Sequence, residues 1–257
     1  MMISKKVVVI GAGAAGLMAG ATAALYGASV TIIEKNKRVG RKIMITGKGR
    51  CNLANNCDVQ TFINNVPVNG RFLYSAINAF TPEDTIDFFE SKGLKTKTER
   101  GNRVFPASDK SVDVVDTMHD YAVESGCKIV CDTANALILE DGAVIGVKCE
   151  ENTYYADSVI ICCGGKSYPL TGSTGDGYIL AKQAGHTIVP LKPSLVPFTS
   201  GDKQCKDMQG LALKNVALRI VDKNSKKAVY SDFGEMLFTH FGMSGPMILS
   251  ASSHIRD

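Results

Sequence analysis

The sequence lacks several features that would point to common functional classes. Its eight cysteines contain no CxxC pair and no Cys/His ligand spacing, and its four histidines are scattered, so we expect no metal site. The net charge of +4 is small, which argues against nucleic acid or an anionic membrane as a partner. There is no internal repeat or low-complexity tract. Cysteines without a disulfide framework are typical of a reducing compartment, and we predict a cytoplasmic protein.

One uncharged stretch, residues 7–33, is long enough to cross a membrane. Because it follows Lys5 and Lys6, it also resembles a signal peptide, but such a peptide would be shorter and would end in a small-residue cleavage site. β-Branched residues cluster at both of its ends, with alanines and glycines between them. This pattern indicates a strand, a helix and a strand, and no later stretch reaches spanning length. We therefore expect no membrane insertion.

The same stretch carries the fingerprint of a dinucleotide site. Residues 7–10 predict a strand, and residues 11–16 read GAGAAG, a GxGxxG turn that opens a helix. A second predicted strand, residues 30–33, ends at Glu34, where a carboxylate can accept hydrogen bonds from a ribose. The three glycines allow, in order, a tight turn, a close approach to a pyrophosphate and close packing of helix on sheet. We predict a Rossmann-like α/β domain with a parallel sheet.

The residues after Glu34 differ from a plain NAD domain, in which a helix would soon follow. Residues 35–52 are instead expected to form a long, basic, glycine-rich loop. Within it, Arg41 and Lys42 can meet diphosphate oxygens through charge-assisted hydrogen bonds. Residues 46–49 can present backbone N–H groups to a ring edge or to an anion. The alternative is a solvated basic turn.

Five blocks of this chain resemble a family of flavoproteins. They read GAGAAG, GRKIMITGKGRCN, GNRVFP, VIICCGGKSYPLTGSTGDGY and LFTHFGMSGP, and they extend over nearly the whole chain. The family is named after aminoacetone oxidase and includes flavin-dependent bile-acid ketosteroid reductases. The resemblance implies an FAD-dependent oxidoreductase. It also implies a longer protein, of which this chain resembles an N-terminal fragment, because a C-terminal segment of the family completes the flavin site.

The resemblance implies FAD contacts at these positions: Gly11, Ala12, Gly13, Ala14, Ala15, Gly16, Glu34, Lys35, Arg41, Lys42, Thr46, Gly47, Gly49, Arg50, Cys51, Asn52, Asn135, Gly164 and Gly165. Arg50 and the backbone of residues 47–49 are expected to stabilise negative charge on a reduced ring. For Cys51 we favour a packing role over a catalytic one. Asp176 is expected either to hold a ribityl hydroxyl or to cap a helix. No catalytic residue is assigned.

The predicted organisation is an FAD-binding domain over residues 1–190, with a helical insertion at about 58–125. The insertion is expected to contain a helix capped by Thr81 and a second helix after Ser108, whose apolar stripe we assign to core packing: Val112, Val115, Met118 and Ala122. A β-meander should follow, with a hairpin turn at Asp141-Gly142. Then comes a buried strand over residues 158–163, in which Cys162 and Cys163 are expected to act as small hydrophobes rather than as a disulfide.

A second domain, an antiparallel β domain of which the chain holds only the start, is predicted over residues 191–257 as a truncated substrate or insert domain. Its strands are expected at residues 216–221 and 229–239, and a helix that begins near Pro246 should still be running at residue 257. Arg103, in the first domain, is expected either to face the substrate or to form a surface salt bridge.

The function predicted from these features is hydride transfer from NAD(P)H, through the flavin, to a carbonyl or conjugated enone of a small-molecule substrate. Only one fingerprint is present, so NAD(P)H would dock transiently. Three alternatives stay open: an amine oxidase that uses oxygen, a non-catalytic flavin- or nucleotide-binding module serving RNA modification or regulation, and a simple NAD dehydrogenase. The oligomeric state is not predicted.

Overall fold

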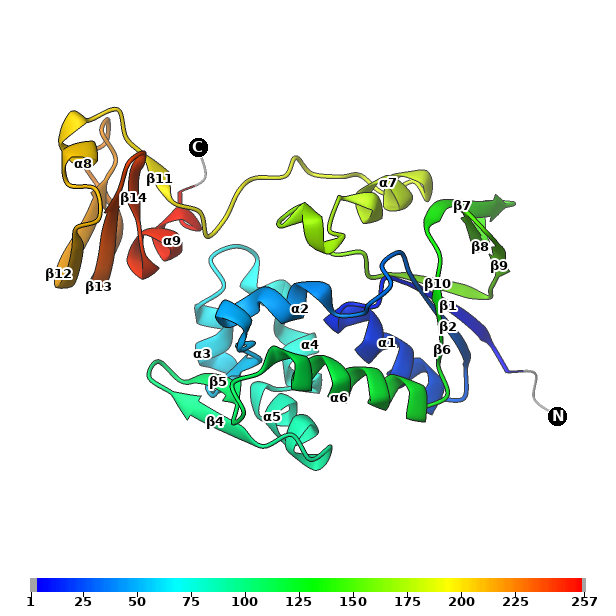
Figure 1. Cartoon of the computed structure of the whole chain (residues 1–257). Helices are drawn as coiled ribbons and strands as arrows, with labels where there is room; N and C mark the ends of the chain where they lie inside the picture. Colours follow the sequence, from blue (N-terminus) through cyan, green and yellow to red (C-terminus); the bar gives the residue numbers. More distant parts are fainter. Residues whose placement is uncertain (1–3, 256–257) are drawn as a thin grey trace. The chain divides into compact units, whose positions relative to one another are not determined.

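The computed structural model describes residues 4–255, and the chain divides into two compact units. The first unit comprises Met1–Ile63 and Arg71–Ile188, and the second comprises Asn64–Gly70 and Val189–Asp257. The division after Ile188 lies close to the boundary expected at residue 190. Each unit is described by itself below (Figure 1).

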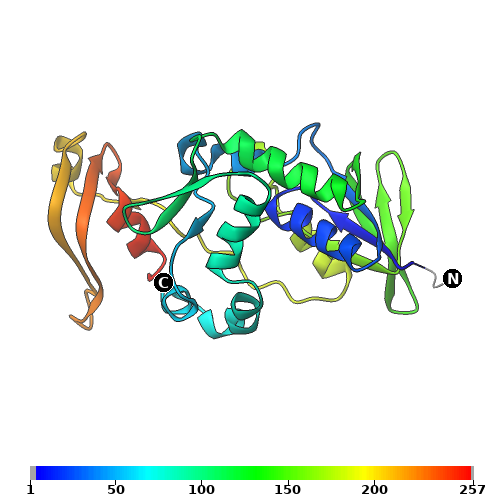
Figure 2. The same cartoon turned by 90° about the horizontal axis from the view of Figure 1, so that it is seen from below.

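The first unit is built on a parallel sheet of four strands in the order β10-β1-β2-β6. The strands are β1 (Lys6–Ile10), β2 (Ser29–Glu34), β6 (Lys128–Cys131) and β10 (Ser158–Ile161). Helix α1 (Ala14–Leu25) connects β1 to β2, and α6 (Ser111–Glu124) leads into β6 and runs beside α1 (Figures 1 and 2). Val9 and Ile32 are fully buried beneath these helices. This is the predicted Rossmann-like domain.

The segment between β2 and α6 contains helices, as predicted, but also a small antiparallel sheet in the order β3-β5-β4. Its strands are β3 (Ala54–Asn55), β4 (Thr96–Glu99) and β5 (Arg103–Pro106). Its helices are α2 (Arg41–Ile45), α3 (Val59–Asn64), α4 (Tyr74–Ala79) and α5 (Pro82–Ser91). We had placed α6 in the insertion, yet it is the crossover helix of the parallel sheet, because it packs on α1 and precedes β6.

Helices α5 and α6 begin close to where the capping residues in the sequence predict. Thr81 caps α5 through a reciprocal pair of hydrogen bonds, in which its side chain accepts from the Asp84 N–H and its own N–H donates to the Asp84 carboxylate. The buried face of α6 differs at one position from the predicted apolar stripe. Val114 is buried whereas Val112 is only half-buried, so the buried face is centred on Val115, Met118 and Ala122.

The predicted β-meander is confirmed as the sheet β7-β8-β9, with β7 (Ala134–Glu140), β8 (Ala143–Cys149) and β9 (Thr153–Tyr155). Asp141 and Gly142 both have positive φ, which suits the two-residue turn that joins β7 to β8. Strand β8 packs on β10, so the meander covers one side of the parallel sheet. After β10 the chain forms a short 3₁₀ turn (Pro169–Thr171) and then α7 (Asp176–Gln183).

The second unit is an antiparallel sheet in the order β11-β14-β13-β12, with two short helices. Its elements are β11 (Phe198–Thr199), α8 (Lys203–Asp207), β12 (Ala212–Val221), β13 (Ala228–Thr239), β14 (Gly242–Ser244) and α9 (Pro246–Ser252). Met236 of β13 packs with Met247 and Ile248 of α9 in its core. The helix begins at Pro246 as predicted but ends at Ser252, earlier than expected, and residues 256–257 of that prediction lie outside the described residues. None of the helices described for residues 4–255 has the length and apolarity needed to cross a membrane.

Candidate dinucleotide-binding site

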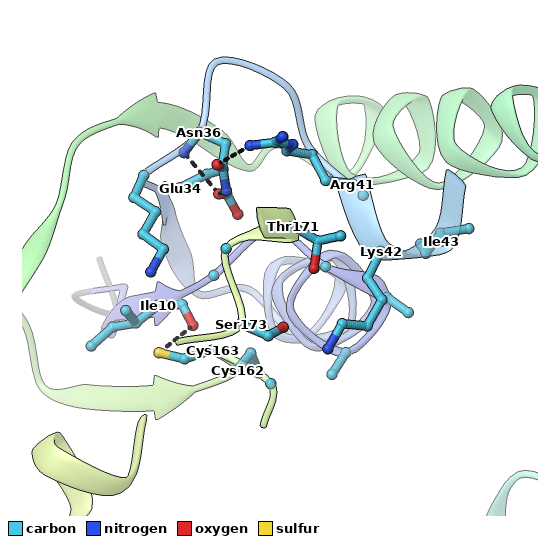
Figure 3. A pocket seen from close by; sticks show the side chains of 18 of the residues that line it. Ile10, Glu34, Asn36, Arg41, Lys42, Ile43, Cys162, Cys163, Thr171 and Ser173 are labelled. Carbon is cyan, nitrogen blue, oxygen red and sulfur yellow. Dashed lines mark hydrogen bonds between the residues drawn. The ribbon is translucent and has the colours of Figure 1, made fainter. Parts of the chain in front are cut away.

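A cavity of about 660 Å³ opens at the carboxyl ends of β1, β2 and β10 (Figure 3). It is lined by the turn after β1, the segment after β2, the segment after β10, the beginning of the meander and part of α6. Ligands of open α/β sheets bind at this edge, and this volume is typical of a small-molecule site. The cavity is therefore where the fingerprint predicts a dinucleotide.

The three glycines of the turn have three different surroundings. Gly11 has φ +101° and donates its N–H to the Ile33 carbonyl at 2.7 Å. A Cβ on Gly16 would lie 1.8 Å from the Gly11 carbonyl oxygen, so helix and turn pack in contact there. Gly13 has an ordinary φ of −83°, and a Cβ on it would meet no atom within 4 Å. Since Gly13 lines the cavity, the space beside it is open to a ligand.

Gly13 is also the N-cap of α1, and its neighbours Ala14 and Ala15 line the cavity. The first N–H groups of a helix have no partner within the helix, and the helix dipole favours an anion beside them. The open space at Gly13 therefore lies against donors that suit a pyrophosphate.

Glu34 is buried, and both of its carboxylate oxygens are held by N–H donors. Oε2 accepts from the backbone of Ala12 at 2.8 Å, and Oε1 accepts from the backbone and side chain of Asn36 at 2.9 and 2.5 Å. The side-chain oxygen of Asn36, Oδ1, in turn accepts from Arg41 Nη1 at 2.7 Å. Ala12 and Gly16, both predicted as contacts, do not line the cavity. Ala12 instead contacts Glu34, and Gly16 packs against Gly11.

The Lys35 side chain contacts the segment after β10. Its Nζ donates to Thr174 Oγ1 at 2.7 Å and to Asp176 Oδ2 at 2.5 Å. Burial alone would raise the pKa of Asp176, but the hydrogen bonds from Lys35 and Thr174 bring it below its ordinary value. Asp176 is the first residue of α7 and Gly175 is the cap, so the structure does not support the capping role we had considered.

The predicted basic loop after Glu34 is partly helical. Gly40 has φ +66° and its N–H donates to the Ala12 carbonyl at 2.9 Å, which turns the chain into α2. Ile43 is buried in the core, and Ser111 Oγ donates to the Met44 carbonyl at 2.9 Å. These distant contacts stabilise a five-residue helix that no local signal indicates. Arg41 and Lys42, its first two residues, line the cavity as expected.

The following turn divides the predicted contacts into two groups. Thr46, Cys51 and Asn52 line the cavity, whereas Gly47, Gly49 and Arg50 do not. The Arg50 guanidinium lies 4.1 Å from the centroid of the Phe105 ring. It donates to both Glu99 oxygens at 2.8 and 3.1 Å and to Asp109 at 3.1 Å. Its charge is thus placed against two carboxylates rather than in the cavity.

The three cysteines of the cavity are free thiols. Cys51 is buried, which raises its pKa, although a hydrogen bond with Thr46 opposes the shift. Burial also raises the pKa of Cys162, and that of Cys163 to about 11. A nucleophilic cysteine needs a lowered pKa, so these surroundings favour packing roles for all three. Neither Cys162 nor Cys163 forms the vicinal disulfide considered from the sequence.

Asp132, which we did not predict, lines the cavity between the end of β6 and the start of the meander. It is 5% exposed, and its carboxylate accepts from the N–H groups of Thr133, Glu151 and Asn152 at 2.8, 3.1 and 3.2 Å. Burial would raise its pKa, but these hydrogen bonds lower it overall. Asn135 does not line the cavity. It lies at a register shift between β7 and β8, and Ala134 lines the wall in its place.

We expect Asp132→Asn to lower the thermal midpoint at neutral pH, because an amide NH₂ would then face N–H donors. A carboxyl with a lowered native pKa stabilises the fold above its unfolded value, near 3.8, and loses that contribution as the pH falls through the native value. The difference between variant and wild type should therefore shrink below pH 3.8. Thermal melts across pH measure this, with the exposed Asp116→Asn as control. A difference that does not change with pH would contradict the assignment.

The rest of the cavity wall combines a predicted glycine with residues that we did not assign to the site. Gly164 lines it as expected, but Gly165 does not. Met118 of α6, which the sequence assigns to the core, belongs to both the core and the cavity, and so does Val114, which we did not predict. The segment Thr171, Gly172 and Ser173 also contributes and was missed. In the part of the chain that is described, no group of three or more acidic, histidine or cysteine side chains could hold a metal.

Comparisons with known proteins identify relatives of the chain. The chain is 31% identical over 250 residues to a 3-dehydro-bile acid delta(4,6)-reductase of Clostridium scindens, with 96% of this chain and 59% of that protein covered. It is 30% identical over 248 residues to a ribosomal RNA dihydrouridine synthase of Escherichia coli, with 96% and 60% covered. It therefore spans about three fifths of these relatives. Neither name mentions aminoacetone oxidase, after which the family in the sequence resemblance is named.

Among solved structures, Mycobacterium smegmatis Sdh1 in complex with UQ1 matches with a TM-score of 0.51 and 20% identity, over 71% of this chain and 38% of that one. At this identity the match supports a similarity of fold and nothing more. The model of the HI0933-like protein Rossmann domain matches residues 5–251, so the match includes every cavity residue. The chain belongs to the family of HI0933-like proteins with this Rossmann domain.

Proposed function

We propose that the protein binds FAD in this cavity and is an FAD-dependent oxidoreductase. The observation that carries the proposal is the open space beside Gly13, where the donors at the start of α1 face the cavity. Its neighbours supply the other groups that a dinucleotide needs. Glu34 can accept from a ribose, and Arg41 and Lys42 can donate to a diphosphate.

We infer FAD rather than NAD from the extent of the cavity and the resemblance to flavoproteins. Beyond α2 the cavity continues to Thr46, Cys51 and Asn52, and its wall there is apolar, formed by Leu53, Val114 and Met118. An apolar wall with a few polar groups suits a flat aromatic ring. Burial raises the pKa of the Cys51 thiol, which disfavours the nucleophilic thiolate and suits a residue that shapes the wall.

We further propose that the reaction is reduction of a carbon–carbon double bond conjugated to a carbonyl. The names of the bile-acid and ribosomal RNA relatives share this chemistry, because dihydrouridine is uridine whose double bond, conjugated to a carbonyl, has been reduced. Bound FAD would supply two-electron chemistry between a donor and an acceptor. In balance, NAD(P)H and one proton are consumed, and the acceptor gains a hydride at its β-carbon and a proton at its α-carbon.

A small conjugated ketone is the first substrate class to test. The full-length protein should lose its visible flavin band when mixed with NADH or NADPH without oxygen, and a steroidal enone should then restore the band. If the band persists with both nicotinamides, but a small amine bleaches it and oxygen is consumed, the protein is an amine oxidase and the proposal is wrong.

A uridine in RNA is the second candidate, favoured by the match to the Escherichia coli relative over 96% of this chain. The small net charge of the chain argues against it, since RNA affinity depends on many phosphate contacts. Mass spectrometry of ribosomal RNA distinguishes the two. NAD(P)H-dependent gain of two hydrogens on a uridine, with no turnover of enones, would select RNA.

A further inference from the structure

We propose that Asn36 is a positioning residue that sets both the ribose-binding carboxylate and the diphosphate-binding guanidinium of this site. The inference rests on the proposed dinucleotide site. Asn36 lines the cavity and is half-buried, and it is the second residue after the end of β2. Figure 3 shows its side chain between Glu34 and Arg41.

The first function of Asn36 is to hold Glu34. Its side-chain Nδ2 and its backbone N–H both donate to Glu34 Oε1, at 2.5 and 2.9 Å. These two bonds and the Ala12 N–H on Oε2 fix the plane of the carboxylate. A carboxylate oxygen has two lone-pair sites, so Oε2 can still accept from a ribose hydroxyl. The orientation of Glu34 is therefore set before a ligand enters.

The second function is to hold Arg41. Asn36 Oδ1 accepts from Arg41 Nη1 at 2.7 Å. A guanidinium has five N–H donors, so four remain for phosphate oxygens while this bond fixes the direction of the side chain. Arg41 is otherwise a long, exposed side chain, and ordering it on binding would cost conformational entropy.

The two contacts require an amide. One end of the side chain must donate to a carboxylate and the other must accept from a guanidinium. Aspartate lacks the donor, and lysine and arginine lack the acceptor. The position is also tightly packed, because a Cβ on Gly172 would lie 2.6 Å from Asn36 Nδ2. Asn36 thus lies close to the segment after β10.

The consequence can be measured with ADP and adenosine as probes on full-length protein freed of flavin. The ratio of the Kd for adenosine to the Kd for ADP reports what the diphosphate adds to binding. We expect Arg41→Ala to lower this ratio about tenfold, the size of one charge-assisted hydrogen bond. Asn36→Ala should lower it by a similar factor and should also weaken adenosine binding. In the double variant, Asn36→Ala should change the ratio less than twofold beyond Arg41→Ala.

Asn36→Asp separates the two functions. It keeps the acceptor for Arg41, so at an ionic strength that screens its added charge the ratio should stay nearer to that of wild type than in Asn36→Ala. It replaces the donor to Glu34 by a second carboxylate, so adenosine itself should bind more weakly. Asn55→Ala is the matched control, since the Asn55 amide donates to the Gly101 carbonyl and does not line the cavity. It should change neither Kd.

Two results would overturn the inference. One is a ratio within twofold of wild type in Asn36→Ala. The other is an Asn36→Ala effect that is undiminished in the Arg41→Ala background, which indicates general loosening of the loop rather than positioning of Arg41. If Asn36→Ala lowers the thermal midpoint of the ligand-free protein, the test passes to Asn36→Asp. A ratio of the two Kd values in Asn36→Asp no nearer to wild type than in Asn36→Ala would then overturn the inference. Wild-type protein that binds neither ADP nor FAD would instead refute the proposed function.

Discussion

Gly13→Val is expected to weaken flavin binding severely with only a small loss of stability. The backbone there is extended, with φ −83° and ψ −171°, which valine adopts readily, and a Cβ would meet no atom within 4 Å. Valine is a poorer N-cap than glycine, so the substitution should lower the free energy of unfolding by only about 1 kcal/mol. The added methyl groups would occupy the space that lets a pyrophosphate approach the start of α1. Losing one or two charge-assisted hydrogen bonds should raise the Kd for FAD at least about 100-fold.

Fluorescence titration with FAD and thermal melts of the flavin-free protein check both parts. Gly201→Val is the matched control, because Gly201 is also surrounded by open space but lies outside the cavity. It should bind FAD as wild type does. Undiminished FAD binding by Gly13→Val would show that no phosphate lies beside this residue.

Gly16→Ala is expected to have the opposite profile, a large loss of stability. Its Cβ would lie 1.8 Å from the Gly11 carbonyl oxygen, a backbone atom that cannot move unless the turn moves. Overpacking of this kind costs about 3 kcal/mol or more. That exceeds the ~1 kcal/mol that alanine gains over glycine inside a helix.

Gly20→Ala provides the comparison within the same helix. Its Cβ would lie 2.6 Å from Ile32 Cδ1, the end of a side chain that can adopt another rotamer. Part of the packing cost is then offset by the helix propensity of alanine, so we expect a net loss below ~2 kcal/mol. Urea denaturation midpoints measure both variants. Equal losses in Gly16→Ala and Gly20→Ala would contradict the close contact between helix and turn.

Features governed by neighbouring residues could be predicted from the sequence. The GAGAAG turn and Glu34 form a local unit, and the structure shows them at one edge of the parallel sheet. The cap at Thr81 and the turn at Asp141-Gly142 also follow from short-range rules. Each depends on residues within a few positions of one another, which a single sequence displays directly.

Features that depend on distant partners could not be predicted. Helix α2 has five residues and is stabilised by core packing of Ile43 and by a hydrogen bond from Ser111. The carboxylate of Asp132 has donors from residues 151 and 152, about twenty positions along the chain. The acids that neutralise Arg50 are similarly remote, at Glu99 and Asp109. In the sequence alone, Arg50 could not be distinguished from a free cation beside the cofactor.

The most direct test of the central claim is the absorption spectrum of the full-length protein, recorded as purified and again after FAD is added and the sample is desalted. The cavity beside Gly13 predicts that visible flavin bands are retained by wild type and lost by Gly13→Val. A wild-type protein that stays colourless after FAD addition while it binds ADP would contradict the assignment of FAD and would favour a different dinucleotide.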